Sequence, residues 1–365
     1  MKKSRLILGL VVLAALAAIV IWGHGKIHFD FAVFRSQLAH VSWREVGIAI
    51  GCIYIGYILR SMRWALLMKH NQKVSLLSLL GTQVIGFTAV ALIGRVADLT
   101  RPYLVARKTG QPLGSQFAVY IVERLFDAGA MALLLSAALF VLPMEGVQHL
   151  EILNRGKHWF LTPKYSFLTF TVLGALFMVL VRMAGGMVAS FFEALFGLVS
   201  KKIGHAVGNK IRSFHTGLDT IRSFADFGAV SGLSLVMWFL ILMAYFETAH
   251  AFVTDPKLAS MSLAKCMLVL ACSGAASFLQ LPVLGWFTQI GIVGEVIHDA
   301  FDVVREAAWA CSAMLLIDTF LSVLPVGLVW AQFEHVNLRE VAVRSEKAGE
   351  QIAVEQAAEP AKGDA

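Results

Sequence analysis

Long hydrophobic runs separated by short polar groups dominate the chain. Six of them approach or exceed the length of about 20 residues that a helix needs to cross a bilayer: Leu6–Trp22, Val46–Met68, Gln116–Leu142, Tyr165–Val181, Ala229–Phe252 and Glu306–Trp330. Two further apolar segments, residues 76–93 and 263–301, are interrupted by Gly, Pro or polar residues. The pattern predicts an all-α polytopic membrane protein with six full transmembrane helices and two broken or re-entrant segments, or eight spans if those are counted.

Basic residues at the ends of these runs set the expected orientation. Lys2, Lys3 and Arg5 precede the first run, and basic residues crowd the end of the second. Because cytoplasmic loops are enriched in Lys and Arg, both termini are predicted to be cytoplasmic, and residues 23–44 form an outside loop. A cleaved signal peptide is the alternative for the N-terminus, since residues 15–17 are small. The apolar run continues past them, which favours an uncleaved helix.

Residues 76–93 have basic residues on both flanks, so a full crossing would place one basic cluster outside. Gly81, Gly86 and Gly94 interrupt the segment, which favours a hairpin that enters and leaves on the cytoplasmic side over a short span. Residues 46–142 and 229–330 then share one order: span, broken segment, span. The first copy starts outside and the second inside, so the sequence predicts an inverted repeat within a single transmembrane domain, residues 1–332.

The segment that joins the two halves, residues 184–228, alternates apolar and basic positions at helical spacing. Such a segment suits an anionic cytoplasmic surface, and a loop that packs against the spans is compatible with the same pattern. The last residues, 333–365, are rich in Ala, Gln and Glu. They are predicted to form a polar cytoplasmic tail that is disordered or a frayed helix.

Composition agrees with a membrane protein, because 58% of the 365 residues are hydrophobic and 15% are charged. The net charge of +7 follows from basic residues beside the spans, so no nucleic-acid partner is expected. Cys52, Cys266, Cys272 and Cys311 lie in apolar surroundings without metal-ligand spacing, and we expect reduced, packed thiols, no metal and no cofactor. The chain contains no nucleophile elbow, HExxH or Walker A motif, which argues against soluble-type catalysis.

The most unusual stretch is residues 94–127, which places many charges between hydrophobic runs. Charges at this depth are costly and are paired or face a polar cavity. The candidate residues for binding a head group are Arg95, Asp98, Arg101, Arg107, Lys108, Glu123, Arg124 and Asp127. Surplus guanidinium groups beside a helix break suit a phosphate. The competing interpretations are Arg–Asp pairs that pin helices together and simple positive-inside topology.

Other polar residues within the spans are secondary candidates: Gln280, Glu295 and Asp318. Asp318 needs a partner or a cavity. Glu295, His298 and Asp299 fit a proton relay, although exposure on an amphipathic face is favoured. Arg60 and Arg63 lie near the end of a span, and we expect them to extend toward the interface.

The run GRVADLTRPYLVARKTGQPLGSQFAVYIVERLFDAG, from Gly94 to Gly129, resembles the lysylphosphatidylglycerol synthase transmembrane-region family of flippase-like membrane proteins. Asp98, Arg101 and Pro102 match the family's acidic-x-x-Arg-Pro element, and Arg124 and Asp127 match its Arg-x-x-Asp pair. The similarity extends from about residue 46 to 330 and includes LQLPVLGW at residues 279–286. Two elements depart from the family pattern, since Asp98 replaces a common Glu and a Pro-Gly-Gly run is absent.

The resemblance implies lipid translocation or an accessory role in lipid or glycan modification. Bifunctional members add a C-terminal aminoacyl-transfer domain, for which the residues after the last span are too few. The leading hypothesis is a lipid translocator of a bacterial cytoplasmic (inner) membrane, with an anionic phospholipid or a lipid-linked sugar in a basic cytoplasm-facing cleft. The alternatives are a membrane-embedded transferase, an accessory subunit that works with a lipid-modifying enzyme, and a non-transporting scaffold.

Overall fold

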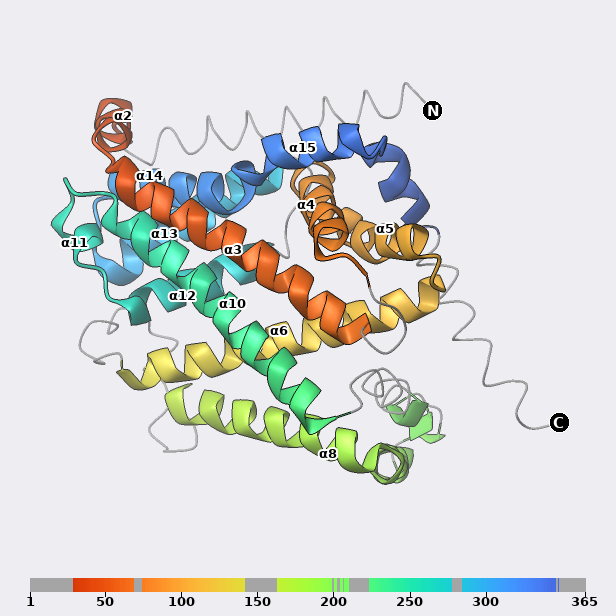
Figure 1. Ribbon diagram of the computed structural model, residues 1–365. Helices are drawn as coiled ribbons and strands as arrows, with labels where there is room; N and C mark the ends of the chain where they lie inside the picture. Colours follow the sequence, from red (N-terminus) through yellow and green to blue (C-terminus); the bar gives the residue numbers. More distant parts are fainter. Residues whose placement is uncertain are drawn as a thin grey trace, which may run out of the picture.

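The computed structural model describes residues 29–68, 74–141, 163–198, 200–201, 204–205, 207–209, 223–277, 284–345 and 347. The predicted first span Leu6–Trp22, residues 142–162, much of the amphipathic segment and most of the tail lie outside these residues. All regular structure in the described part is helical. Figure 1 shows the helices packed as one layered bundle.

The helices in chain order are α2 (Phe31–Ala39), α3 (Trp43–Met68), α4 (Leu76–Ile93), the 3-10 helix η1 (Arg95–Leu99), α5 (Thr100–Thr109), α6 (Leu113–Val141), α8 (Pro163–Gly197), α10 (Phe224–His250), α11 (Pro256–Ala259), α12 (Leu263–Ala276), α13 (Leu284–Phe301), α14 (Arg305–Leu316), the π-helix η5 (Ile317–Leu321) and α15 (Val323–Phe333). Within the described residues, α3, α4, α10 and the continuous helix Arg305–Phe333 are long and apolar enough to cross a membrane. The all-α polytopic prediction is therefore confirmed.

Helices α3 and α10 run side by side in opposite directions (Figure 1). At one end, the backbone N–H of Ser42 donates to the carbonyl of Ala251 at 2.9 Å. Toward the other end, Arg63 on α3 donates to the hydroxyl of Ser234 on α10 at 2.7 Å. The first helix of each predicted half thus packs against its counterpart.

The first interrupted segment is a helical hairpin formed by α4, η1 and α5. Gly94 joins α4 to η1 with φ of 94°, a conformation that favours glycine because it has no Cβ. Near the end of α5, the ammonium of Lys108 donates to the carbonyl of Ser78 at 3.3 Å. The chain therefore returns toward the level at which α4 began. Re-entry on one side of a membrane stays a prediction, since α4 is also long and apolar enough to cross one.

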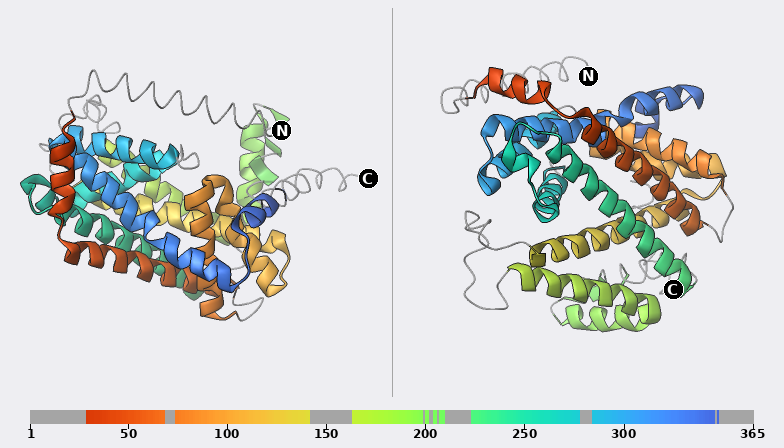
Figure 2. Two further views of the ribbon diagram at one scale, coloured as in Figure 1. Left: turned by 90° about the horizontal axis from the view of Figure 1, so that it is seen from above. Right: turned by 60° about the vertical axis from the view of Figure 1, so that its left-hand side comes forward.

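The second interrupted segment, α12 and α13, has the same form. Lys265 near the start of α12 lies 5.5 Å from the ring centroid of Phe301 at the end of α13, so these helices are also antiparallel. The two hairpins meet near their tips, where the indole N–H of Trp286 donates to the carbonyl of Ala91 at 3.1 Å. Figure 2 gives two further views of the arrangement.

Each hairpin packs against the last helix of the other half, α4 against α15 and α12 against α6. Residues that are predicted to lie on the same side of the membrane also contact one another. On the predicted outside, Thr254 bonds Gln37 at 2.7 Å, and on the predicted inside Lys108 pairs with Glu334 at 2.6 Å. The division into inverted halves stays a prediction, and these helix directions favour it.

Two sequence-based descriptions change and one boundary is matched. Part of the predicted outside loop is α2, whose first turn is capped by the Asp30 carboxylate accepting from the backbone N–H of Ala32 at 2.8 Å. The predicted change of periodicity at Ala184 coincides with a kink in α8. Residues 338–345 of the predicted tail are helical, which is the second of the two forms expected. Val341 and Ala342 are buried there against residues of α4, η1 and α5, so apolar spacing outweighs the polar composition.

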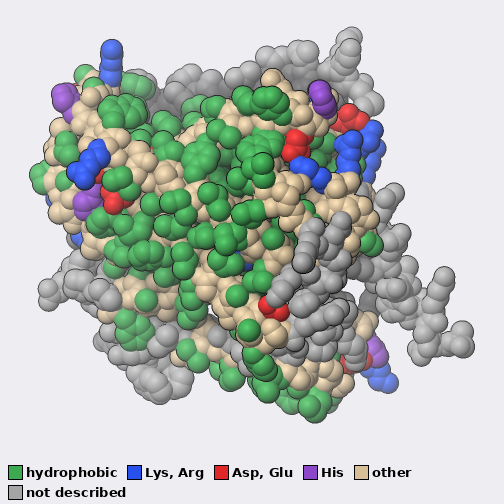
Figure 3. All heavy atoms as spheres, in the orientation of Figure 1, with side chains coloured by type: hydrophobic (Ala, Val, Ile, Leu, Met, Phe, Trp, Pro, Cys, Tyr) green, Lys and Arg blue, Asp and Glu red, His purple; other side chains and the backbone are tan. Residues whose placement is uncertain are grey.

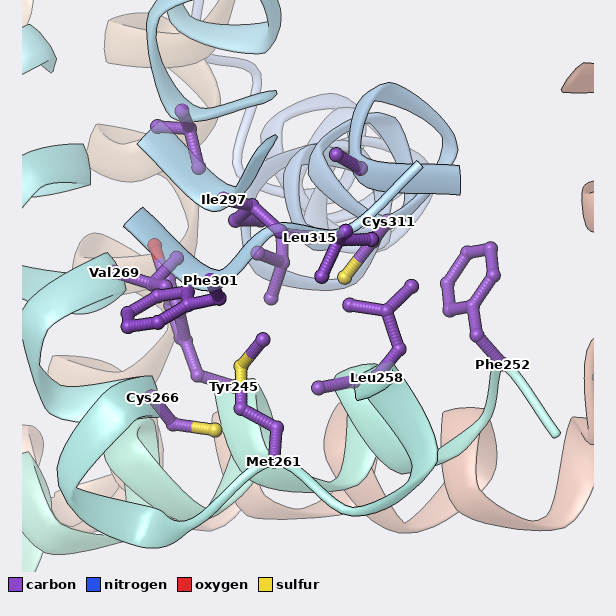
Figure 4. Packing of buried hydrophobic residues seen from close by; sticks show 14 of the residues in the cluster. Tyr245, Phe252, Leu258, Met261, Cys266, Val269, Ile297, Phe301, Cys311 and Leu315 are labelled. Carbon is purple, nitrogen blue, oxygen red and sulfur yellow. The ribbon is translucent and has the colours of Figure 1, made fainter. Parts of the chain in front are cut away.

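Packing of the second half centres on a cluster that includes Tyr245, Leu258, Met261 and Leu315 (Figure 4). Cys311 is buried in the same cluster, and all four cysteines of the chain are free, as expected. On the outer face over α3 and α10, hydrophobic side chains predominate and charged ones gather toward the edges (Figure 3). A contiguous apolar surface of this kind suits contact with lipid.

Gly327 allows close contact between α15 and α4. A Cβ at this position would overlap the Thr88 hydroxyl, and would lie 2.7 Å from Thr88 Cβ and 3.1 Å from the Val84 carbonyl oxygen. Gly327→Ala is therefore expected to destabilise the protein by about 1–3 kcal/mol, measured by thermal unfolding in detergent. Gly232→Ala on α10 is the matched control, because a methyl group added there would have no other atom within 4 Å. Equal stability of the two variants would contradict the packing.

Candidate functional site

Arg63 is the centre of a buried charge cluster between α3, α6 and α10. Its side chain is only 1% exposed, and its guanidinium donates to Glu123 at 2.8 Å and to Asp127 at 2.7 Å. Trp238 on α10 donates to the same Asp127 oxygen at 3.1 Å. Because Glu123 and Asp127 are four residues apart, they lie on one face of α6, where a single guanidinium contacts both.

Arg101 extends the cluster into the first hairpin. It lies in the first turn of α5, is fully enclosed, and pairs with Asp98 at 2.9 Å and with Glu123 at 3.3 Å. Tyr120 donates to the second Asp98 oxygen at 2.6 Å. Gly86 on α4 makes room for the stem of Arg101, since a Cβ there would overlap it. The hairpin turn is thus tied to α6 by ion pairs.

Two further arginines in the cluster are paired less completely. Arg60 lies 3.5 Å from Glu123 and 3.9 Å from Asp127, and Arg124 lies 3.8 Å from Asp127. Nε and Nη2 of Arg124 are buried without a hydrogen-bond partner. Among the described residues, four guanidinium groups therefore face the carboxylates of Asp98, Glu123 and Asp127, which leaves one positive charge in excess.

A cavity of about 210 Å³ adjoins this cluster and lies between the two hairpins. Arg60, Asp98 and Arg124 line one part of it, and its walls are largely apolar, with Phe87, Val90, Met131, Met237, Ile241, Leu270 and Phe320. Ser273 and Gln289 of the second hairpin line another part, and the Gln289 amide donates to Ser273 at 2.9 Å. The Gln289 carbonyl oxygen is buried without a partner. The cavity thus joins a cationic region to a neutral polar one through apolar walls.

The structure brings together five of the predicted residues: Asp98, Arg101, Glu123, Arg124 and Asp127. It does not place Arg107 and Lys108 with them, since both are exposed in the last turn of α5 and Lys108 pairs with Glu334. The side chain of Arg95 and the whole of Gln280 lie outside the described part. Glu295 accepts from Trp309 at 2.9 Å and pairs with Arg305 at 3.1 Å, at the predicted outer end of the bundle.

The expected interfacial placement of Arg60 and Arg63 is wrong. Both are buried, and Arg63 makes the shortest ion pairs of the cluster. The signal that could have identified them is the three-residue spacing, which puts both on the helix face toward Glu123 and Asp127. Among the described residues, no group of three or more His, Cys, Asp or Glu side chains is arranged to hold a metal ion.

Comparison with protein families identifies a match over residues 6–282 to the family described as Lysylphosphatidylglycerol synthase TM region. The chain belongs to this family. The match begins earlier and ends earlier than the predicted range of about 46–330, and it includes all seven charged residues of the cluster. No curated protein and no solved structure matched the chain. Family membership and the apolar helices make it a multi-pass integral membrane protein.

Proposed function

We propose that this member of the Lysylphosphatidylglycerol synthase TM region family is a lipid translocator of a bacterial cytoplasmic membrane, with both termini cytoplasmic. An anionic head group enters the cavity between the hairpins and binds to Arg124 and Arg60. The observation that carries this proposal is the pair of buried Arg124 nitrogens without hydrogen-bond partners at the wall of a largely apolar cavity.

The other charged residues position these two. Arg63 and Arg101 make the closest ion pairs of the cluster, to Glu123, Asp127 and Asp98, so they hold the three carboxylates in place. Arg60 and Arg124 have long contacts to the same carboxylates and can exchange them for phosphate oxygens, which guanidinium groups bind bidentately. The excess positive charge compensates an entering anion, and the apolar walls suit the part of the lipid next to the head group.

The test is head-group inversion in liposomes that contain the purified protein and a labelled anionic phospholipid. We expect the wild type to move the label between leaflets. A wild type that leaves the lipid in its original leaflet would overturn the proposal. A covalently altered lipid in the same assay would instead support the alternative, a membrane-embedded transferase.

Arg124→Ala should lower the inversion rate by roughly ten- to one-hundredfold, because a hydrogen bond to a charged group contributes about 1.5–3 kcal/mol. Arg124 is a better choice than Arg101, whose removal would leave Glu123 and Asp98 buried with fewer partners. Arg107→Ala is the matched control, since that side chain is exposed and outside the cluster. Folding of each variant is checked by thermal unfolding. Equal rates for Arg124→Ala and Arg107→Ala would contradict head-group binding at Arg124.

A further inference from the structure

Asp318 is a buried carboxyl group outside the arginine cluster. It lies at the middle of the 29-residue helix Arg305–Phe333, within the π-helical turn η5, and its side chain is 0% exposed. The wider turn is marked by the backbone N–H of Ser322 donating to the carbonyl of Ile317 at 2.8 Å. Single π turns inside α-helices occur frequently at functional sites.

The hydrogen bonds around Asp318 are complete when it carries a proton. Thr248 on α10 places its hydroxyl 2.7 Å from Asp318 Oδ2 and 2.8 Å from the carbonyl of Ala244. A hydroxyl has a single hydrogen, so it cannot donate to both acceptors. If Asp318 is protonated, it donates to the Thr248 oxygen, and Thr248 donates to Ala244. Both oxygen–oxygen contacts of the Thr248 hydroxyl are then hydrogen bonds with a hydrogen of their own.

The surroundings disfavour a charged carboxylate. Among the described residues, no Lys or Arg forms an ion pair with Asp318, and Asp318 Oδ1 has no hydrogen-bond partner. Helices α4 and α15, which pack against η5, have no titratable side chain. Of the other neighbours, α3 contributes Tyr54, which donates to the carbonyl of Ser322, and α14 contributes Cys311. On α10, Glu247 precedes Thr248 in the chain and is an acid. On α3, the cation Arg60 pairs with Glu123 and Asp127 instead. An unpaired carboxylate at this depth costs several kcal/mol.

We propose that Asp318 is a proton-binding site that couples lipid movement to the proton gradient. In the described conformation it is the neutral acid. When the cavity opens to the other side, water reaches the carboxyl group and accepts its proton, which leaves a carboxylate that takes up a proton again from the opposite side in the next cycle. This coupling rests on the proposed translocation.

The position of Asp318 links it to the cavity. Thr319 and Phe320, the next two residues of the π turn, line the cavity, and Tyr54 on α3 donates to the carbonyl of Ser322 at 3.0 Å. If the hairpins rearrange and admit water past Thr319, the water therefore has only one turn of helix to pass before it reaches the carboxyl group. Removal of the proton requires that hydration, because the charged form needs water as its partner.

The test compares wild type, Asp318→Asn and the exposed control Asp299→Asn in liposomes with an imposed pH gradient. If one proton moves with each lipid, a pH difference of one unit across the membrane changes the equilibrium ratio of label between the leaflets by about tenfold. We expect that shift for wild type and Asp299→Asn, and its abolition by a protonophore. Asp318→Asn should give the same ratio with and without the gradient. A wild-type ratio that does not respond to pH would overturn the coupling.

Infrared difference spectroscopy tests the proton site without transport. At neutral pH we expect the carbonyl band of a protonated carboxylic acid in wild type and its loss in Asp318→Asn. Absence of the band from wild type would overturn the proposal. If the band is present but the wild type moves no lipid, the proposed translocation fails while the proton site stands, so the two failures are distinguishable.

Discussion

Arg63→Met is expected to lower the free energy of unfolding by about 3–5 kcal/mol, the largest effect of any single substitution in the cluster. Removing one partner of a buried ion pair leaves the opposite charge uncompensated, and Arg63 contacts both Glu123 and Asp127 within 2.8 Å. Because Met retains much of the apolar stem of Arg, the decrease in stability measures the effect of removing the charge. The measurement is thermal or denaturant unfolding in detergent, together with the yield of folded protein.

Two matched variants separate charge from packing. Arg107→Met makes the same substitution at an exposed position in α5 and should change stability by less than about 0.5 kcal/mol. In the triple variant Arg63→Met, Glu123→Gln, Asp127→Asn, the carboxylates left unpaired by the first change are neutral, which should recover much of the loss. A triple variant as unstable as Arg63→Met alone would show that the guanidinium acts through packing.

The sequence predicts the carboxylates of this cluster but not all of its arginines. A sequence shows which residues are close along the chain, but not which residues of different helices contact one another. Glu123 and Asp127 stand out by their place in an apolar run. Arg63 is separated in the chain from Glu123 by 60 residues and from Asp127 by 64 residues. It is predicted to lie at the membrane interface because it is near a helix end. Only the antiparallel packing of α3 and α10 carries that part of α3 into the bundle.

Sequence proximity also groups residues that the fold separates. Arg101 and Arg107 are six residues apart in α5, which at 1.5 Å per residue is about 9 Å along the helix axis. Arg101 is therefore inside the cluster while Arg107 is at the exposed end. The interruptions of the two apolar runs are predictable because Gly94 breaks the first run and Gln280 and Pro282 break the second. The packing of residues 338–345 is not predictable, since their few apolar residues pack on the first hairpin and on the end of α15.

Single cysteines at the ends of the two hairpins are expected to react from opposite sides of the membrane. Ser75→Cys and Arg107→Cys lie at the two ends of the first hairpin, and Ser260→Cys and Val304→Cys flank the second; all four positions are exposed. In a background without the four native cysteines, a membrane-impermeant thiol reagent should label the first pair from the predicted cytoplasmic side only and the second pair from the other side only.

Both cysteines of a pair should be labelled from the same side of the membrane, because contacts hold the two ends of each hairpin together. Lys108 bonds the carbonyl of Ser78, so the ends of the first hairpin cannot lie on opposite faces, and Lys257 pairs with Asp302 at 2.5 Å at the ends of the second. Labelling of Ser75→Cys and Arg107→Cys from different sides would mean that the first segment crosses the membrane. Labelling of both pairs from one side would overturn the inverted arrangement, and with it the placement of the cavity between two hairpins that enter from opposite faces.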